Sequence, residues 1–352
     1  MRESTFRKPG AAWVASIILA ACAALAVVLV GCGSGANGSS FHGSQDGGSD
    51  GGLSGDGFGC LTCDDGASVG DGGAGDGNGQ IVLPPNFVST VLGGYALGPS
   101  LLDGGADAGL PANPGTGCAL VVGVVRDFKY AGDPGPGQDD PDFGNFCCGV
   151  TPGLVQATLD ANGKPQFAGI CDQGNADVSD TAVCPGGQML TTQANFTEWF
   201  HDTPDVNLPY LVYLEFVKNG SVSTFEADGN SEYFPLDGAG WGNNATVGGV
   251  AHNFGFTTEL HLLFTYNGGE TFSFTGDDDV WVFIDGKLAV DIGGVHPSAT
   301  SSVQLDGLGL TKGSQYPLDI FNAERHLTNS DFRVDTNLSF ANCGTIPTGT
   351  AQ

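Results

Sequence analysis

The chain has 352 residues, long enough for one large or two small domains. Its charge is sparse and one-sided, because 39 Asp and Glu residues stand against 11 Lys and Arg residues, a formal net charge of -28. Such a surface repels the phosphates of nucleic acids, so the composition excludes nucleic acid as a partner.

The N-terminus predicts export. Basic residues precede the apolar stretch 11–30, as in a signal peptide, although the length of this stretch also suits a membrane anchor. LVGC at 29–32 resembles a bacterial lipobox, which implies removal of residues 1–31 and attachment of lipid to Cys32. We therefore expect a lipoprotein of the outer membrane or cell surface, held to the membrane by this lipid. Plain secretion and an uncleaved anchor are the alternatives.

Residues 32–80 are predicted to be a disordered acidic linker. They are almost wholly Gly, Ser, Asp and Asn, too poor in apolar side chains to form a core. A calcium-binding glycine-aspartate repeat is the alternative, but no fixed period runs through the segment. Residues 81–117 are intermediate: their first half, IVLPPNFVSTVLGGYALG, could supply a short strand or a packed arm before the linker composition returns.

Eight cysteines follow the signal region, and an even number in an exported protein favours disulfides over metal thiolates. CLTC at 60–63 could be half of a zinc site, but no second pair with suitable spacing follows. Cys118 and Cys343 bracket the compact region and could tie its ends together. The disulfide candidates are Cys60, Cys63, Cys118, Cys147, Cys148, Cys171, Cys184 and Cys343.

From Cys118 onward, short runs rich in Val, Phe, Tyr and Thr predict strands separated by Gly, Pro and Asn. Many runs alternate, as TFSFT does at 271–275, which suits a sheet with one buried face. Only TTQANFTEWFHD (191–202) has a helical spacing of apolar residues. These patterns predict an all-β fold, an antiparallel β-sandwich or flattened barrel with long loops. The strand segments are 118–128, 208–217, 261–268, 270–276, 280–285, 287–294, 301–307, 316–322 and 331–340.

The dipeptide Asp285-Gly286 lies between VWVFI and KLAV, which predicts a β-hairpin with a tight turn. Three adjacent carboxylates, Asp277–Asp279, then fall at the open end of this hairpin, with Asp291 nearby. Clustered carboxylates are tolerated when they are solvated and stabilised when a hard cation binds them. Calcium takes six to eight oxygen ligands and accepts such clusters.

The block HNFGFTTELHLLFTYNGGETFSFTGDDDVWVFIDGKLAVDIGGVH (252–296) resembles the fibro-slime domain, a branch of the PA14-like β-sandwich family. The resemblance covers roughly residues 118–343, which predicts a fibro-slime domain at 118–345 with a PA14-like sandwich fold. Further matching segments are VVRDFKY (124–130), DDPDFGNF (139–146), EYFPLDGAGWG (232–242), LDGLGLTKGSQYPLDIFNAERH (305–326) and SDFRVDTNLSF (330–340).

This resemblance implies a calcium site. In sugar-binding members of the wider family, two adjacent aspartates joined by a cis peptide bind calcium, and the calcium binds sugar hydroxyls. The resemblance places Asp277 and Asp278 on that pair. Because a third aspartate follows, the pair could instead be Asp278 and Asp279, and Asp279 is a further candidate ligand. It places Asn322 on the third side-chain ligand and suggests a main-chain carbonyl from the loop that ends at His326.

We expect a non-enzymatic, calcium-dependent recognition or adhesion module at the cell surface, with a glycan or matrix polysaccharide as the candidate ligand. One alternative is a structural envelope protein whose metal only stabilises its loops. Another is a glycoside hydrolase-like enzyme, because paired carboxylates cleave glycosidic bonds. Three adjacent aspartates on one loop, however, cannot flank a bond from opposite sides, and no G-x-S-x-G or H-E-x-x-H motif is present.

Other residues near these motifs are assigned structural roles. Trp241 or Trp281 could offer a stacking face to a sugar, but Trp281 lies inside a predicted strand and is rather expected in the core. His252 and His261 lie on separate strand-like segments, and we expect them to be structural rather than zinc ligands. The run Glu324–His326 is expected to organise its loop through local contacts.

Overall fold

The computed structural model describes residues 84, 86–90, 92–102, 118–130, 133, 135–144, 149–169, 190–227 and 232–346. The chain divides into two units, Met1–Ala67 and Ser68–Gln352, and every described residue lies in the second. The predicted signal peptide, the lipidation site Cys32 and the Gly-rich linker fall outside the described residues and stay predictions. Within the described ranges, no helix combines the length and the apolar character that crossing a membrane requires.

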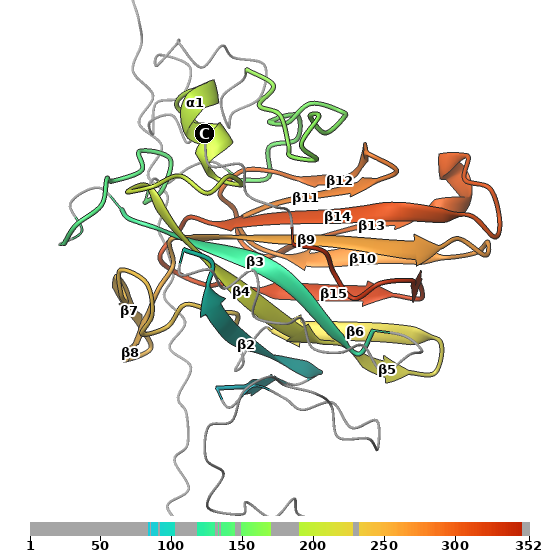
Figure 1. The fold of residues 1–352 in the computed structure, drawn as a ribbon, viewed down its shortest axis with the longest axis horizontal. Coiled ribbons are helices and arrows are strands. Elements are labelled where there is room, and N and C mark those ends of the chain that lie inside the picture. The colour runs from blue at the N-terminus through green and yellow to red at the C-terminus, as the bar shows by residue number, and fades with distance from the viewer. Residues whose placement is uncertain are drawn as a thin grey trace, which may run out of the picture. The chain divides into compact units, whose positions relative to one another are not determined.

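Nine strands of the described region form the larger of two main sheets, and their pairings are antiparallel. Their order is β1-β2-β4-β3-β9-β14-β11-β12, and β16 pairs with β9 (Figure 1). The strands are β1 (Val88–Thr90), β2 (Gly93–Ser100), β3 (Leu120–Phe128), β4 (Asn207–Glu215), β9 (Phe256–Thr265), β11 (Asp279–Ile284), β12 (Lys287–Ile292), β14 (Gln315–Glu324) and β16 (Ser339–Phe340).

The second main sheet has the order β13-β10-β15-β6-β5, and a separate two-stranded sheet pairs β7 with β8. Two short helices complete the described elements, α1 (Gln193–Glu198) and the 3₁₀-helix η2 (Leu305–Leu308). The strands are β5 (Val217–Asn219), β6 (Val222–Ala227), β7 (Ala245–Val247), β8 (Val250–His252), β10 (Thr271–Gly276), β13 (Ala299–Gln304) and β15 (Phe332–Thr336).

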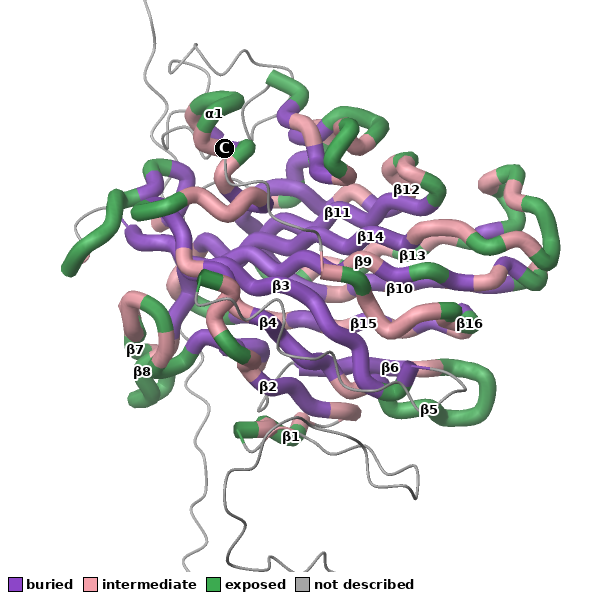
Figure 2. The backbone as a smooth tube through the Cα atoms, viewed as in Figure 1, coloured by how far each residue is buried: buried purple, intermediate pink, exposed green. Residues whose placement is uncertain are grey.

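The main core lies between the two sheets, as the buried strands of Figure 2 indicate. In β10, Phe272 and Phe274 are fully buried while the Thr and Ser residues that alternate with them are half-buried, as the sequence predicted. Phe272 and Phe274 pack in the same cluster as Val280 and Val282 of the larger sheet. The predicted all-β sandwich is therefore confirmed.

The larger sheet is also covered on its outer face, where β11 passes beneath α1 and the surrounding loops. Val280 and Val282 belong to the core between the sheets, but Trp281 and Phe283 pack into a second apolar cluster with Phe196 of α1. A strand that is buried on both faces needs a continuous apolar run, and this explains VWVFI. The prediction that Trp281 is a core residue is confirmed, since it is fully buried.

The predicted hairpin joins β11 to β12, with Ile284 opposite Lys287. Asp285 and Gly286 both have positive φ, 54° and 68°, as the tight turn predicted from their sequence requires. The predicted helix within 191–202 is also present, although α1 spans only Gln193–Glu198. Thr192 caps it by accepting a hydrogen bond from the Asn195 main-chain N–H at 3.1 Å.

The ordered sheet extends further toward the N-terminus than the predicted boundary at Cys118. Strand β2 pairs with β4 inside the larger sheet, with Tyr95 opposite Leu214. Tyr95 and Ala96 are buried, so the segment predicted as a short strand or a packed arm supplies a strand to the sheet. The sequence signal was weak because three glycines interrupt the apolar residues of β2.

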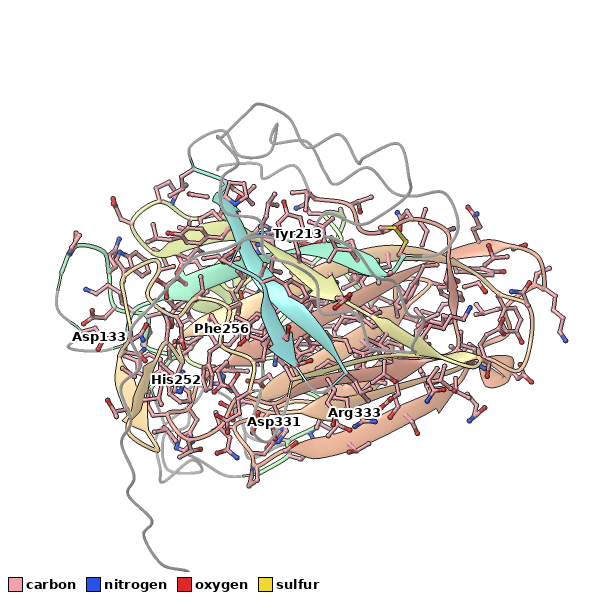
Figure 3. The ribbon with its side chains drawn as sticks, turned by 90° about the horizontal axis from the view of Figure 1, so that it is seen from below. Asp133, Tyr213, His252, Phe256, Asp331 and Arg333 are labelled. Carbon is pink, nitrogen blue, oxygen red and sulfur yellow. A yellow bond between two sulfur atoms is a disulfide. The ribbon has the colours of Figure 1, made fainter. Side chains whose placement is uncertain are left out.

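Cys118 and Cys343 form a disulfide, drawn in yellow in Figure 3. The bond closes a sequence separation of 225 residues, and its Cα atoms are 5.0 Å apart. The prediction that these two cysteines tie the ends of the compact region is confirmed. The other candidates, Cys60, Cys63, Cys147, Cys148, Cys171 and Cys184, lie outside the described residues.

Candidate metal site

The three aspartates lie where the chain crosses from one sheet to the other. Strand β10 ends at Gly276 and β11 begins at Asp279, so Asp277 and Asp278 form the whole connection. The peptide bond between Asp277 and Asp278 is cis. Of the two aspartate pairs that the sequence left open, 277/278 and 278/279, the first therefore has the cis bond. Because Val280 pairs with Asn322 of β14, this connection lies beside the end of β14.

Main-chain amides from three separate positions hold the two carboxylates of the connection. Asp277 Oδ1 accepts a hydrogen bond from the Asp331 N–H at 2.6 Å. Asp278 Oδ1 accepts one from the His296 N–H at 3.1 Å, and Asp278 Oδ2 accepts one from the Arg325 N–H at 3.0 Å. Both aspartates are buried, so the loops that carry these amides enclose them.

Asp279 has a different role from its two neighbours. Its Oδ1 accepts a hydrogen bond from the Gly294 N–H, and its Oδ2 forms an ion pair of 2.7 Å with Arg325 Nε. Both side chains are fully buried. The Asp279 carboxylate is thus compensated by a guanidinium, and its role as a further metal ligand stays a prediction.

Asn322 is brought to the site, as the resemblance implied. Its Nδ2 donates to the main-chain carbonyls of Asp277 at 3.2 Å and Asp279 at 3.3 Å. With the amide nitrogen used in this way, Oδ1 is the side-chain atom that could bind a cation. His326 lies in the loop that follows β14, where its Nδ1 contacts Thr328 Oγ1 at 2.9 Å. A ligand role for the His326 carbonyl stays a prediction.

Glu324 is a member of the site that the sequence reading did not single out as a ligand. It is the last residue of β14, it is only 1% exposed, and its Oε1 accepts a hydrogen bond from the His326 N–H at 3.2 Å. Its Oε2 has no hydrogen-bond partner among the described residues. Burial, followed by the carboxylates of Asp278 and Asp277, raises the pKa of Glu324 well above its usual value.

The site has too little positive charge for its carboxylates. Burial raises the pKa of Asp277 to about 8, and the Asp331 main-chain N–H lowers it only in part. Burial likewise raises the pKa of Asp278 to about 7, where Arg325 opposes the shift and Asp279 adds to it. A divalent cation would offset the repulsion, and oxygen atoms are the ligands that calcium prefers.

The donor set fits a cation that is bound partly by main-chain and amide oxygens. Among the residues that the structure describes, no group of three or more His, Cys, Asp or Glu side chains converges as a metal site. Asp277 and Asp278 would supply two carboxylates, so Asn322 Oδ1 and main-chain carbonyls would have to complete the shell. Glu324 Oε2 is buried and has no hydrogen-bond partner among the described residues. The carboxylates of this site therefore lack part of the compensation that buried polar groups require.

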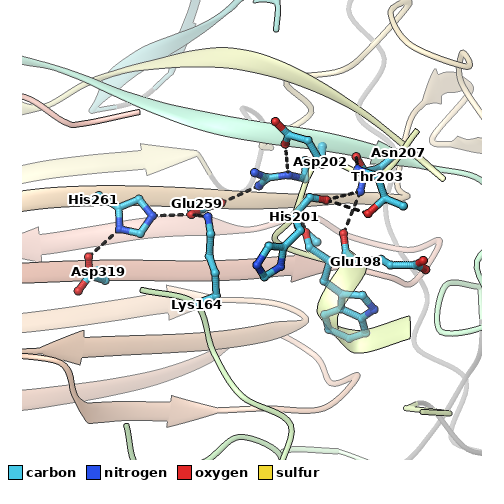
Figure 4. A network of polar contacts seen from close by, with 12 residues as sticks. Lys164, Glu198, His201, Asp202, Thr203, Asn207, Glu259, His261 and Asp319 are labelled. Atoms are coloured by element: carbon cyan, nitrogen blue, oxygen red, sulfur yellow. Dashed lines mark hydrogen bonds and ion pairs between the residues drawn. The ribbon is translucent and has the colours of Figure 1, made fainter. Parts of the chain in front are cut away.

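A second buried polar network lies on the outer face of the larger sheet, about Glu259 of β9 (Figure 4). Glu259 Oε2 forms an ion pair of 2.6 Å with Arg126 Nη1, and Glu259 Oε1 contacts both Lys164 Nζ and His261 Nε2. Although burial acts in the other direction, Arg126 and Lys164 hold the pKa of Glu259 well below its usual range. His261 is thus a structural residue, as predicted.

The other residues predicted to be structural have comparable roles. His252 Nδ1 contacts Asp237 Oδ2 at 2.7 Å, and the His252 ring stacks on Phe234 with ring centroids 3.8 Å apart. Trp241 is half-buried, and its main-chain N–H donates to Asp127 Oδ2 at 2.6 Å. No contact of Trp241 with the aspartate connection is present among the described residues, so its use as a stacking face stays a prediction.

The His261 contacts predict a pH dependence of stability. Burial lowers the pKa of His261, but hydrogen bonds to Asp319 Oδ1 and Glu259 Oε1 outweigh it and raise the pKa from 6.5 to about 8. A raised pKa stabilises the fold fully below pH 6.5, and this stabilisation is lost as the pH rises through about 8. The shift corresponds to roughly 2 kcal/mol.

The comparison of His261→Gln with the unsubstituted chain isolates this contribution from other groups that titrate in the same range. Urea unfolding at pH 6 and pH 8.5 should show that the unsubstituted chain loses roughly 2 kcal/mol more than His261→Gln. Equal losses in the two proteins would contradict the assignment.

Part of this chain matches the model of a known protein family. Residues 219–348 match the PA14 domain. The matched region includes the whole β10–β11 connection, with Asp277 and Asp278, and it includes Asn322 and Glu324. The candidate metal site therefore lies inside the region that matches the PA14 domain, whereas Arg126 and Lys164 of the Glu259 network lie N-terminal to it.

The relatives of this chain are long proteins of Dictyostelium discoideum. Protein psiD is 39% identical over 213 residues, which are 59% of this chain and 40% of psiD. Protein psiQ is 36% identical over 213 residues, 58% of this chain and 20% of psiQ, and protein psiH is 50% identical over 168 residues, 43% of this chain and 23% of psiH. The chain thus spans two fifths or less of the length of these relatives.

One solved structure is also similar, the crystal structure of the PA14 domain of the MpAFP antifreeze protein. The similarity covers 38% of this chain and 80% of that chain, with 10% sequence identity and a TM-score of 0.24. We infer nothing about the fold or the function from a similarity this low.

Proposed function

We propose that this chain is an exported, non-enzymatic recognition or adhesion module whose PA14 domain binds calcium between Asp277, Asp278 and Asn322. A hydroxyl-rich ligand, a glycan or matrix polysaccharide, would occupy positions that the protein leaves open on the ion. The chain would act at the cell surface, attached through lipid on Cys32 or released as a secreted protein.

The observation that carries this proposal is the pair of buried carboxylates at the crossing between the two sheets. Their nearest guanidinium, Arg325, forms its ion pair with Asp279 instead, while Glu324 adds a further buried carboxylate beside them. A cation of charge +2 is the simplest way to compensate such a cluster. The match of residues 219–348 to the PA14 domain supports the same site, because it includes all the proposed ligands.

A specific observation favours a second function, in which the ion only holds the loops together. Asp277 is 4% exposed, and Asp278 and Asn322 are each 2% exposed, so the proposed ligands lie beneath the surface. An ion enclosed in this way would stabilise the connection between the sheets without meeting a sugar. This alternative is the structural envelope protein considered from the sequence, and a binding experiment separates it from recognition.

Calcium is expected to raise the melting temperature of the purified chain relative to the same chain in chelator. A ligand at 100 times its dissociation constant adds about 2.7 kcal/mol to the free energy of unfolding. For a domain of this size that corresponds to a rise of roughly 5–10 °C. Calorimetry monitors the melting, and isothermal titration with calcium gives the affinity and the stoichiometry.

The double variant Asp277→Asn/Asp278→Asn should lose the calcium response. Asp285→Asn is the matched control, because Asp285 lies at the opposite end of β11 and its side chain is exposed. No heat on adding calcium to the unsubstituted chain would overturn the calcium site. If calcium binds, an array of glycans tested with calcium and with chelator distinguishes recognition from the structural role, which predicts stabilisation without glycan binding.

A further inference from the structure

Arg325 contacts the aspartate connection with both its main chain and its side chain. It is the residue directly after β14, and it is fully buried. Its main-chain N–H donates to Asp278 Oδ2 at 3.0 Å, and its Nε donates to Asp279 Oδ2 at 2.7 Å. The position of Arg325 is therefore determined by one proposed calcium ligand and by the aspartate next to it.

The same residue contacts a second segment, Asp140–Gly144, again through both main chain and side chain. Its Nη1 donates to the main-chain carbonyl of Asp142 at 3.1 Å, and its own carbonyl accepts a hydrogen bond from the Gly144 N–H at 3.1 Å. The Arg325 guanidinium also lies over the Trp199 ring, 4.8 Å from its centroid. Arg325 thus joins the cation site to a segment more than 130 positions earlier in the chain.

The Asp140–Gly144 segment is buried and carries incompletely compensated charge of its own. Asp140 is 2% exposed, and its Oδ2 has no hydrogen-bond partner among the described residues. Burial, followed by the carboxylate of Asp142, raises the pKa of Asp140 to about 8, which the Arg325 guanidinium opposes. Asp142 Oδ1 in turn accepts a hydrogen bond from the Thr191 N–H at 2.7 Å, just before α1.

One guanidinium therefore contacts two separate segments, through the Asp279 carboxylate and the main-chain carbonyl of Asp142. A cation that holds the Asp278 carboxylate in place also holds the main chain of Arg325, which is bonded to it. Arg325 in turn makes one main-chain and one side-chain hydrogen bond to the Asp140–Gly144 segment. Such a contiguous series of polar contacts is a physical route for coupling between two places in a protein.

We propose that Arg325 is a positioning residue that couples occupancy of the cation site to the order of the Asp140–Gly144 segment. The inference rests on the proposed function, since it concerns the same site. By linkage, an ordered segment favours cation binding as much as the cation favours order, and loss of the Arg325 side chain weakens this mutual effect. Groups that orient metal ligands from outside typically change metal affinity by 10–100-fold when they are replaced.

Amide hydrogen exchange of the full chain, with calcium and with chelator, tests the coupling segment by segment. In the unsubstituted chain, calcium should slow exchange at residues 277–279, and also about tenfold at residues 140–144, within the 5–150-fold range of typical couplings. In Arg325→Met the slowing should persist at 277–279 at a higher calcium concentration, and it should be several-fold smaller at 140–144, where only the main-chain hydrogen bond from Gly144 to residue 325 remains. Isothermal titration should give a calcium affinity 10–100-fold lower.

Two further variants keep the test decisive. Arg325→Met leaves Asp279 buried without its partner and could fail to fold, so the double variant Asp279→Asn/Arg325→Met removes both charges together. It should likewise show a several-fold smaller calcium effect at 140–144. Arg333→Met is the control, because Arg333 pairs with Glu226 and Asp335 on the other sheet (Figure 3) and should retain the effect.

The outcomes distinguish the coupling from the cation site itself. Slowing at 277–279 with no change at 140–144 in the unsubstituted chain would refute the coupling and leave the calcium site standing. Slowing at 140–144 of undiminished size in the double variant would refute the role of the Arg325 side chain. No effect of calcium at either segment would remove the proposed calcium site, and the coupling with it.

Discussion

Replacing Cys118 and Cys343 together by serine is expected to lower the free energy of unfolding by about 5 kcal/mol. The disulfide closes a separation of 225 residues, so it removes a large loop-closure entropy from the unfolded chain. In the folded state its main effect is local, where the Cys343 carbonyl accepts a hydrogen bond from the Val122 N–H at 2.8 Å. Urea unfolding under oxidising conditions measures the difference.

A reductant provides the control for this prediction. Under reducing conditions the unsubstituted chain should approach the stability of the double variant, while the double variant itself should change much less. Equal stability of the two oxidised proteins would contradict the entropic argument, because the serine residues leave the buried surroundings of the disulfide almost unchanged.

Glu259→Gln is expected to destabilise the fold by about 3–5 kcal/mol, because it leaves buried cations without their shared carboxylate. Arg126 would keep its ion pair of 2.9 Å with Asp202, and His261 would keep Asp319. Among the described residues, Lys164 has no other ion pair. The glutamine keeps the size of the side chain, so the loss is electrostatic rather than a loss of packing.

The loss should also loosen the segment that carries Lys164 over the outer face of the sheet. This segment is held to the β11–β12 hairpin by hydrogen bonds from the Leu288 N–H to the Ala157 carbonyl at 2.9 Å and from the Leu159 N–H to the Gly286 carbonyl at 3.3 Å. Urea unfolding measures the stability. Asp285→Asn, which removes an exposed ion pair with Lys287, should cost less than about 1 kcal/mol. A similarly small cost for Glu259→Gln would contradict the buried-charge argument.

The calcium site and the Glu259 network use acidic residues in opposite ways. Glu259 is surrounded by three basic side chains, Arg126, Lys164 and His261, and is compensated within the protein. Asp277 and Asp278 are instead held by main-chain amides, which donate hydrogen bonds but carry no full charge. This difference explains why we propose a cation for Asp277 and Asp278 and none for Glu259.

The sequence by itself determined the features that depend on neighbouring residues. The alternation of TFSFT, the Asp285-Gly286 turn and the spacing of Phe196 and Trp199 each predicted an element that the structure contains. These signals are local, because a strand or a tight turn repeats its pattern within a few residues. The motif strings at 252–296 and 305–326 added the expectations of the aspartate pair and of Asn322, respectively.

Only the tertiary structure decided which charged groups meet. Asp277, Asp278 and Asp279 are the same residue type in adjacent positions. Of the three, Asp279 is the one whose carboxylate pairs with the side chain of Arg325, 46 positions away. Glu259 meets Arg126 across 133 positions and Lys164 across 95. Such pairs depend on the register of antiparallel strands and on the crossing between the two sheets. No local pattern encodes these, because a shift of one residue in register would exchange the two faces of a strand.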